Sequence, residues 1–404
     1  MSKKSPQLRF KGFTDDWEER KLGEVGYFYY GKSAPKWSVT EDAETPCVRY
    51  GELYTKYGAK ISNIYSHTNI NPKNLKFSTG NEVLVPRVGE NPLDFSLCSW
   101  LSIPNVAIGE MISVYNTNEN PLFISYYFRS QMKYEFAKRV EGGNVSNLYY
   151  SYLEDIDLYI PKLEEQIAIS KFFEKLDDTI ALHQRKLDLL KEQKKGYLQK
   201  MFPKNGAKVP ELRFAGFADD WEERKLKELG DIQTGNTPPT SDSDNYSLDG
   251  VLWVTPTDIK SLVISNTAKK LSQVGVTKAR IAKAGSILVT SIASIGKNTL
   301  LRMDAGFNQQ INSLTPTSEN DSYFLLTQSE KWSEKMKQTA ASATMQIVNK
   351  TDFSNISTYV PVHKEEQEKI GSFFKQLDDT IALHQRKLDL LKEQKKGFLQ
   401  KMFV

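Results

Sequence analysis

The stretch LDDTIALHQRKLDLLKEQKKG occupies residues 176–196 and recurs without a change at residues 377–397. Apolar residues recur in it at alternating spacings of four and three, which is typical of a helix that pairs with another helix along a narrow seam. From about 164 to 200 such a helix would extend roughly 55 Å at 1.5 Å per residue. The first copy of the seam comprises Leu176, Ile180, His183, Leu187, Leu190, Lys194, Tyr197 and Met201. His183 and Lys194 interrupt its apolar character, so we expect the seam to open or meet water there.

The similarity extends beyond the helix, so the chain is one unit written twice. PQLRFKGFTDDWEERKLGEVG begins at Pro6 and is matched by PELRFAGFADDWEERKLKELG at Pro210. GNEVLVPRVG at Gly80 likewise resembles GSILVTSIASIG at Gly285. The intervening parts, 17–160 and 221–360, are mostly dissimilar. The predicted domains are 1–162 and 203–362, each followed by a repeated helix, and those helices cover 163–202 and 363–404.

Composition limits the class of protein. Apolar residues make up 39% and charged residues 26%, as in globular proteins. The two cysteines, Cys47 and Cys98, cannot build a disulfide framework or a cysteine zinc site. Residues 1–13 have no apolar core of a signal peptide, and no apolar run is long enough to span a membrane, so we expect a cytoplasmic protein. The net charge of +4 does not by itself indicate nucleic-acid binding.

The globular parts mix strand and helix patterns. EVLVPRV, SILVTSI and LWVT are short apolar or β-branched runs bounded by Gly, Pro, Asn or Ser, and we expect strands there. LFISYYFRSQMKYEFAKRV and SYFLLTQSEKWSEKMKQ have helical periodicity. The predicted fold class is α+β: two mixed globular domains separated by a pair of long antiparallel helices in a pseudo-two-fold repeat.

Two arrangements of the helices compete. Each helix could pack only on its own domain, but a narrow seam present in two identical copies favours pairing of one helix with the other. Two identical helices related by a two-fold axis must then run antiparallel, which separates the two domains. A parallel pair would place both domains at one end.

The exposed face of the helix is repeated along with the seam. Surface substitutions typically change stability by less than about 0.5 kcal/mol, so packing alone does not demand this identity. Recent duplication is one explanation, but it would have left the globular domains alike as well. The alternative is that both helices bind the same partner, so that one chain holds two copies of it. The candidate partner-binding residues are Gln184, Arg185, Asp188, Lys191, Glu192, Gln385, Arg386, Asp389, Lys392 and Glu393.

This organisation resembles the specificity subunit of Type I restriction–modification systems, over essentially the whole chain. The resemblance is carried by the repeated EEQ…FF…LDD run, the repeated glycine-led strand and the segments Trp17–Leu22 and Trp221–Leu226. It implies two target recognition domains that each read half of a bipartite DNA sequence. It also implies that the helices set the spacer and dock two methyltransferase subunits, and that motor and nuclease subunits join the full complex. In that complex S-adenosylmethionine, ATP and Mg serve the partner subunits, and this chain binds no cofactor.

The motifs of a stand-alone enzyme are missing. Gly296-Lys297 lacks the first glycine of a phosphate-binding loop, because Ser291 occupies that position. NTPP at Asn236 departs from the adenine methyltransferase signature at Thr237. The histidines are scattered, and no catalytic or metal-binding set is recognised. A non-DNA coiled-coil adaptor that carries two ligand-binding domains is the alternative to DNA recognition, and the two differ in salt-dependent binding of duplex DNA.

Candidate DNA-reading residues are polar side chains in loops that interrupt the strand pattern, where they can reach base edges in the major groove. Among them, Arg87 suits guanine and Gln346 suits adenine. In the first domain they are Lys32, Ser33, Lys36, Arg49, Tyr50, Arg87, Asn144, Ser146 and Asn147. In the second they are Asn236, Thr237, Thr257, Ser291, Ser294, Lys297, Asn298, Thr344 and Gln346.

Overall fold

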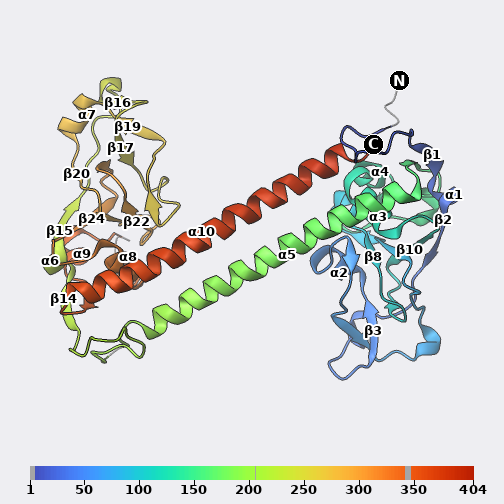
Figure 1. Cartoon of the computed structure of the whole chain (residues 1–404), viewed down its shortest axis with the longest axis horizontal. Helices are drawn as coiled ribbons and strands as arrows, with labels where there is room; N and C mark the ends of the chain where they lie inside the picture. Colours follow the sequence, from blue (N-terminus) through green and yellow to red (C-terminus); the bar gives the residue numbers. More distant parts are fainter. Residues whose placement is uncertain (1–4, 205, 342–346) are drawn as a thin grey trace. The chain divides into compact units, whose positions relative to one another are not determined.

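The computed structural model describes residues 5–204, 206–341 and 347–404 and divides into two compact units (Figure 1). The first unit comprises Met1–Gln184 and Lys387–Val404, and the second comprises Arg185–Arg386. Each unit therefore contains one globular domain and about half of each long helix. Among the described residues, no helix combines the length and the apolar character that crossing a membrane requires.

The two repeated stretches form long helices of equal length. Helix α5 covers Leu163–Lys200 and α10 covers Lys364–Lys401, each with 38 residues. In the first unit, Phe172 of α5 contacts Phe398 of α10, with ring centroids 5.1 Å apart. In the second unit, Tyr197 of α5 contacts Phe373 of α10 at 5.0 Å. The early part of each helix thus meets the late part of the other, which confirms the predicted antiparallel pairing.

We expected the seam to open or meet water at the charged residue Lys194, but its ammonium group pairs with a carboxylate of the opposite helix instead. Its Nζ lies 2.6 Å from Asp378 Oδ1 in the second unit, and both side chains are largely buried. In the first unit the equivalent Lys395 pairs with Asp177. Each aspartate also accepts a tyrosine hydroxyl, from Tyr126 at 2.8 Å or Tyr323 at 3.1 Å. We call these two sets of Asp, Lys and Tyr the junction triads.

The repeated EEQ sequence is explained by contacts at the start of each long helix. The guanidinium of Arg9 donates two hydrogen bonds of 2.7 Å to Glu165. Arg213 donates two to Glu366, at 2.7 and 2.8 Å. The glutamine that follows each glutamate accepts a backbone N–H from the loop before a domain helix. These contacts attach the segment before each domain to the long helix that follows that domain.

The first domain is built on a five-stranded sheet with the order β2-β10-β6-β8-β4. Two three-stranded sheets, β5-β3-β9 and β11-β12-β7, complete it, and strand β1 pairs with β13. The helices α1 (Leu22–Val25), α2 (Tyr50–Thr55), α3 (Pro121–Gln131) and α4 (Lys133–Ala137) lie around these sheets. The strands are β1 Glu18–Lys21, β2 Gly26–Tyr30, β3 Thr45–Val48, β4 Lys60–Ile61, β5 Ser66–Thr68, β6 Glu82–Pro86, β7 Val88–Gly89, β8 Ser99–Leu101, β9 Ala107–Ile108, β10 Ile112–Thr117, β11 Glu141–Gly142, β12 Ser146–Asn147 and β13 Asp157–Ile160.

The second domain has the same framework sheet, in the order β15-β24-β21-β22-β18, but a different companion, the five-stranded sheet β16-β19-β17-β23-β20. Its helices are α6 (Leu226–Leu229), α7 (Gln273–Lys278), α8 (Ser322–Ala341) and α9 (Lys350–Ser354). Strand β14 pairs with β25. The strands are β14 Glu222–Lys225, β15 Gly230–Thr234, β16 Tyr246–Ser247, β17 Val251–Val254, β18 Val263–Ile264, β19 Lys269–Leu271, β20 Ile281–Ala282, β21 Ile287–Thr290, β22 Asn298–Leu301, β23 Ala305–Phe307, β24 Ile311–Pro316 and β25 Ser357–Val360.

The expected elements are present with one difference. The predicted strands appear as β6, β21 and β17. The helix expected over LFISYYFRSQMKYEFAKRV is instead two helices, α3 and α4, which are separated at Met132. Met132 has φ −87° and ψ 1°, between the two helices, and its side chain is buried in the core. The corresponding α8 runs unbroken for 20 residues.

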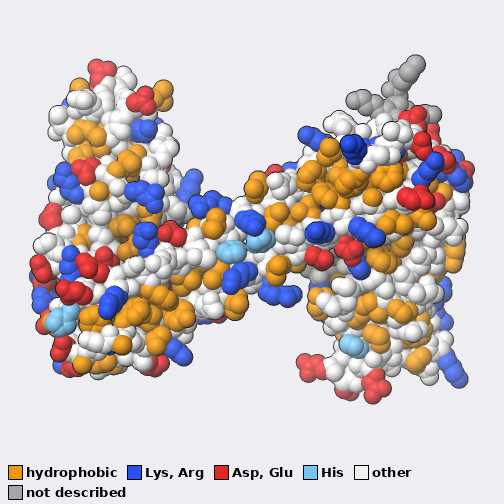
Figure 2. Space-filling model, in the orientation of Figure 1, with side chains coloured by type: hydrophobic (Ala, Val, Ile, Leu, Met, Phe, Trp, Pro, Cys, Tyr) orange, Lys and Arg blue, Asp and Glu red, His pale blue; other side chains and the backbone are white. Residues whose placement is uncertain are grey.

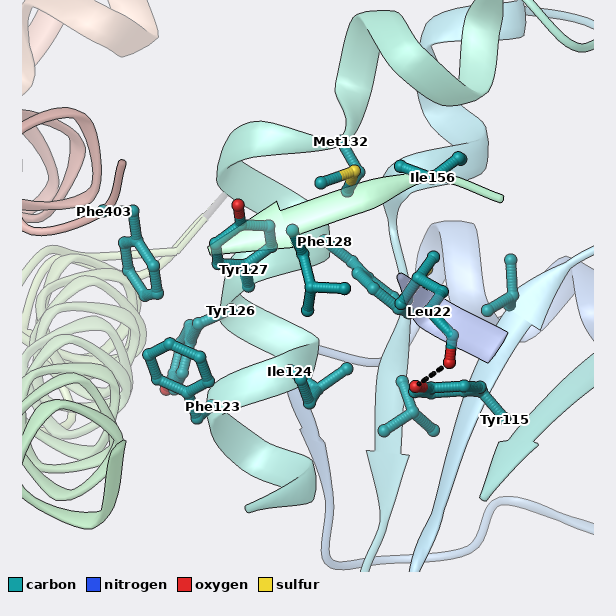
Figure 3. Close-up of a cluster of buried hydrophobic side chains, with 14 of the residues drawn as sticks. Leu22, Tyr115, Phe123, Ile124, Tyr126, Tyr127, Phe128, Met132, Ile156 and Phe403 are labelled. Carbon is teal, nitrogen blue, oxygen red and sulfur yellow. Dashed lines mark hydrogen bonds between the residues drawn. The ribbon is translucent and has the colours of Figure 1, made fainter. Parts of the chain in front are cut away.

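The end of each long helix closes the core of the unit it reaches. Phe403, which follows α10, packs against Phe123 and Tyr127 of α3 (Figure 3), and it also packs against Trp17. Deeper in the same core, the Tyr115 hydroxyl donates a hydrogen bond of 2.8 Å to the Leu22 carbonyl (Figure 3). The second unit repeats the arrangement, with Phe202 after α5 against Trp221 and Phe324. The helix end is therefore part of each domain core.

The buried Arg213–Glu366 pair generates a prediction about stability. Glu366 is fully buried, and its hydrogen bonds raise the pKa of Arg213. Substitution Arg213→Ala leaves a buried carboxylate without its partner, and we expect the second unit to lose about 3–5 kcal/mol of stability. Thermal unfolding followed by circular dichroism should show a transition lowered by roughly 10 °C.

The matched control for this prediction is the double substitution Arg213→Met and Glu366→Met, which removes both charges and keeps apolar volume. We expect it to recover most of the lost stability, because a buried ion pair can be replaced by apolar side chains at little cost. Equal melting temperatures for Arg213→Ala and the unchanged protein would contradict a role for the pair in holding the leading segment.

Candidate nucleic-acid interface

The loop after β2 presents the first group of candidate residues. Lys32 and Lys36 are exposed, whereas Ser33 is half-buried and has φ 61°, a left-handed conformation that residues with a side chain rarely adopt. Gly31 precedes them, and a Cβ there would lie 2.1 Å from the Gly109 carbonyl oxygen. The glycine thus allows two backbones to meet and shapes the loop that exposes the lysines.

Arg49 and Tyr50 lie where a loop enters α2. The backbone N–H of Arg49 donates to Glu52 Oε2 at 2.9 Å, which caps the helix. Both side chains are half-buried. Tyr50 lines a surface pocket of about 340 Å³ together with Gly89 and Val145, next to the hairpin of β11 and β12. The pocket connects this helix to the next group of candidates.

Arg87 lies against the β11–β12 hairpin, although the two are far apart in sequence. The Arg87 carbonyl accepts the backbone N–H of Leu148 at 2.9 Å, and β12 pairs with β7 just after Arg87. The hairpin carries the candidates Asn144, which is exposed, Asn147, which is half-buried, and Ser146, which is buried. The Ser146 hydroxyl donates to the Gly143 carbonyl, so it supports the turn. The structure therefore unites Arg87 with the hairpin as one surface.

The Arg87 side chain is held without a carboxylate. Its guanidinium carbon lies 4.7 Å from the centre of the Tyr30 ring, and Nη2 lies 3.3 Å from the Met111 sulfur. Its Nε is buried and has no hydrogen-bond partner among the described residues. Burial raises the pKa of Tyr30, and the Arg87 charge opposes that rise. A planar cation fixed by stacking retains N–H groups for an acceptor that approaches from outside.

Aromatic residues around Arg87 were missed in the sequence. Tyr30 contacts Tyr150 at 4.6 Å between ring centres, and the Nζ of Lys76 lies 5.0 Å from the Tyr29 ring. Tyr27 on the same strand is exposed. Stacked aromatic and cationic side chains of this kind also bind nucleic-acid bases and backbones. The signal was the GYFYY run of β2, whose aromatic character looked like ordinary strand composition.

In the second domain, the side chain of the candidate Asn236 hydrogen-bonds to a neighbouring segment of the backbone. Its Nδ2 donates to the Lys278 carbonyl at 2.7 Å, and its Oδ1 accepts the backbone N–H of Arg280 at 2.6 Å. The neighbouring Thr237 donates its hydroxyl to Gln309. These two side chains therefore tie the loop after β15 to segments 278–280 and 309. They shape the surface there. Arg280, which lies beside them, is a basic residue that was not among the candidates predicted from the sequence.

The loop between β21 and β22 has a similar internal frame. Ser291 is buried and its hydroxyl donates to the Gln310 carbonyl at 3.0 Å. Ser294 is half-buried, and its carbonyl accepts the Thr290 hydroxyl at 2.5 Å. Asn298 lies within 3.4 Å of the Gly296 carbonyl. Lys297 is exposed and is the member of this group best placed to meet a ligand.

The remaining candidates in the second domain are Thr257, Thr344 and Gln346. Thr257 is exposed, and its hydroxyl lies 2.8 Å from that of Thr255 at the end of β17. Thr344 and Gln346 lie outside the described residues. The segment that follows them does reach the β21–β22 loop, because Val348 donates its N–H to the Ser291 carbonyl at 3.0 Å.

The candidate partner-binding residues lie along the two long helices. Their side chains are exposed apart from those of Gln184 and Gln385, which are half-buried. The structure adds four leucines that the seam pattern had left out: Leu182 is 64% exposed, Leu189 52%, Leu383 58% and Leu390 58%. These apolar side chains are exposed at equivalent positions of both helices. We call them the repeated leucines.

Comparison with known proteins adds the family. The model of the Type I restriction modification DNA specificity domain matches residues 14–192 and again 218–393. The chain belongs to this family of Type I restriction–modification specificity subunits. The Type I restriction enzyme MjaVIII specificity subunit of Methanocaldococcus jannaschii is 21% identical over 95% of this chain and 91% of its own length. The HindI specificity subunit of Haemophilus influenzae is 29% identical over 40% of this chain and 37% of its own.

Solved structures share the fold. The S subunit of a Type I restriction–modification system from M. genitalium superimposes with a TM-score of 0.69 at 14% identity, over 99% of both chains. Specificity subunits are the non-catalytic members of these systems. Membership of the family therefore favours DNA recognition over the ligand-adaptor alternative.

The surface chemistry of the specificity subunit is mixed. Lys and Arg side chains lie interspersed with Asp and Glu on the visible face of both units (Figure 2). No cluster of three or more His, Cys, Asp or Glu side chains that could hold a metal ion occurs within the described part of the chain. Burial raises the pKa of the Cys47 thiol to about 11, so this cysteine is not activated as a nucleophile.

Arg87 generates the prediction for this surface. We expect Arg87→Lys, assembled with the methyltransferase subunit, to keep its folding and its charge but lose the planar fork that binds one base. Discrimination at one position of the methylated sequence should relax by about 1–3 kcal/mol. Sequencing of modified adenines in cells that carry the variant measures this directly, and Lys73→Arg, at an exposed lysine outside the candidate set, serves as a control that keeps its charge. An unchanged methylated sequence would remove Arg87 from the base-reading residues.

Proposed function

We propose that each globular domain of this specificity subunit reads one half of a bipartite DNA sequence. The pair of long helices sets the number of unread base pairs between the halves. Two copies of a methyltransferase subunit dock on the repeated helices. Methylation with S-adenosylmethionine, and ATP- and Mg-dependent cleavage by motor and nuclease subunits, belong to the partners.

One observation carries this proposal: the contacts at the helix junctions are duplicated, whereas the domains that they hold are not. The junction triads, the Arg–Glu pairs and the closing phenylalanines Phe202 and Phe403 all occur twice. The companion sheets differ between the domains. Recognition of two different half-sites by one symmetric assembly requires this combination of duplicated junction contacts and dissimilar domains.

The support for DNA reading lies at the framework sheets. In both domains a loop that follows the first framework strand begins at a glycine, Gly31 or Gly235, pressed against another backbone. Beyond these glycines, Lys32, Ser33 and Lys36 of the first domain are replaced by Asn236, Thr237 and Thr240 in the second, although Pro35 and Pro239 match. A constant frame with variable polar loops suits direct readout, because base identity is recognised by particular side chains placed at base edges.

The support for two docked partners is the repeated leucines. Each helix carries two of them, seven residues apart and therefore on one face. Arg185 and Glu192 on α5, like Arg386 and Glu393 on α10, flank them with the same charges. An exposed apolar strip with a charged border is typical of a helix surface that receives partner helices.

The proposed spacer function can be measured by lengthening both helices by one turn. We expect duplication of Leu182–Arg185 in α5, together with Leu383–Arg386 in α10, to add about 6 Å along the pair. The preferred spacer should then grow by one or two base pairs, at about 3.4 Å each. Sequencing of modified adenines reports both half-sites and the spacer. The same insertion in one helix only is the control, and we expect it to abolish methylation because the helices no longer match.

The proposed docking can be tested through subunit stoichiometry. We expect Leu189→Glu to leave one methyltransferase subunit per chain, and Leu189→Glu with Leu390→Glu to leave none, because a buried charge opposes an apolar contact. Native mass spectrometry of the purified complex counts the subunits. Leu248→Glu, at the most exposed leucine of the second domain (92%), is the matched control. Two bound copies in the double variant would exclude these leucines from the interface.

A further inference from the structure

The second unit contains a basic groove between the last part of α5 and helix α8. It has a volume of about 1140 Å³ and is lined by residues 191–204, by Glu211 and by α8 residues 327–338. None of the candidate DNA-reading residues that the structure describes lines it. The groove is therefore separate from the described recognition loops of the second domain, and α5 and α8 form its two walls.

Positively charged side chains outnumber negatively charged ones in this groove. Within the described part of the chain, seven lysines and three glutamates line it, without an arginine. Lys194 is used by its junction triad, and Lys204 pairs with Glu211. Lys191, Lys195 and Lys200 on α5 form no ion pair among the described residues, and the same holds for Lys331 on α8. The groove thus keeps a surplus of uncompensated positive charge.

The lysines stand on opposite walls at matching intervals. Lys191 and Lys195 are four residues apart on α5, and Lys331 and Lys335 are four residues apart on α8, so each pair lies along one face of its helix. Lys331 Nζ lies 5.3 Å from the centre of the Phe202 ring. Lys335 Nζ donates to the Ser357 carbonyl at 2.6 Å, which fixes its position.

Two lysines of the same sign lie close together on the α8 wall. Loss of hydration lowers the pKa of Lys331 most, Glu334 raises it, and the charge of Lys335 lowers it by a smaller amount. Like charges four residues apart on a helix also destabilise it slightly. A ligand that brings negative charge between the two walls reduces the repulsion between these lysines.

Phosphate is the anion that this chemistry fits best. Lysine binds phosphate as a compact point charge, whereas a planar carboxylate is bound best by the fork of arginine, which the groove lacks. Contacts from lysines to phosphates position a duplex without reading its sequence. A DNA specificity protein needs such contacts beside the base pairs that it reads, because they supply most of the affinity.

We propose that this groove holds the sugar–phosphate backbone of duplex DNA beside the half-site of the second domain, in a sequence-independent manner. The proposal rests on the proposed function, since it assumes that the assembled protein binds duplex DNA. Lys331 and Lys335 form one side of the contact and Lys191 and Lys195 the other. Lys191 also belongs to the candidate partner surface, so the α8 pair decides between DNA and protein.

The test measures affinity for duplex DNA against salt concentration, with the complete methyltransferase complex. The duplexes carry either the methylated sequence or a scrambled one. With Lys331→Gln and Lys335→Gln together, we expect the slope of log affinity against log salt to fall in magnitude by roughly 2. Affinity at low salt should drop on the order of 10-fold on both duplexes. The methylated sequence itself should not change.

Three further variants make the result decisive. Lys331→Arg with Lys335→Arg keeps the charge and should keep the slope. Lys227→Gln with Lys337→Gln removes two exposed charges of the same unit outside the groove and should leave the slope unchanged. Lys191→Gln with Lys195→Gln should reproduce the effect of the α8 pair. Melting curves confirm that each variant folds.

The outcomes separate the groove from the function on which it rests. If the unchanged complex binds neither duplex, the proposed function fails. If that complex binds but the α8 variant has the same slope and affinity, the groove proposal is overturned. Loss of the methyltransferase subunit from the α8 variant, measured by native mass spectrometry, would also overturn it, because the groove would then hold an acidic protein segment.

Discussion

One carboxylate fixes each junction between the two long helices: Asp177 in the first unit and Asp378 in the second. Each accepts a lysine ammonium from the opposite helix and a tyrosine hydroxyl from the adjoining domain. Because every copy of the repeat has its aspartate early and its lysine late, an antiparallel pair satisfies both charges at both junctions. A parallel pair would place aspartate opposite aspartate, and like charges at partly buried positions cost energy. Helix direction and domain attachment therefore depend on the same few atoms.

The two domains show how one frame supports different surfaces. The framework sheets share strand order, and each buries a tryptophan, Trp17 or Trp221, against the phenylalanine that follows a long helix. Beyond that frame the chain builds two small sheets in the first domain and one five-stranded sheet in the second. In the second domain, the side chains of Asn236 and Ser291 donate hydrogen bonds to backbone carbonyl groups, which holds their loops in place. Rigid loops lose little entropy when they bind, which favours specific recognition.

The elements that depend on the local spacing of apolar residues were predictable from the sequence. The helix period gave the two long helices and their antiparallel pairing, and the family resemblance gave the class. What depended on tertiary contacts was not predictable. The partner of Lys194 is Asp378, 184 positions away, and the break at Met132 arises from packing in a domain core. Arg87 was selected for its chemistry, but its stacking on Tyr30 and its contact with the 144–147 hairpin come from strand pairing. Polar loop residues looked alike in sequence, and only the fold separates Asn236, which is used internally, from Lys297, which is exposed.

The identity of residues 176–196 and 377–397 has an evolutionary consequence. A genetic crossover anywhere within this repeat joins the upstream part of one copy to the downstream part of another, and the resulting helix has the same sequence. Its aspartate, lysine and leucines stay in place, so the helix side of the junction is kept and only the tyrosine must come from the new domain. The identical stretch thus lets recognition domains be exchanged between genes without renewed selection for assembly. The Asp–Lys contact that attaches each domain to the paired helices would therefore be unchanged by such an exchange.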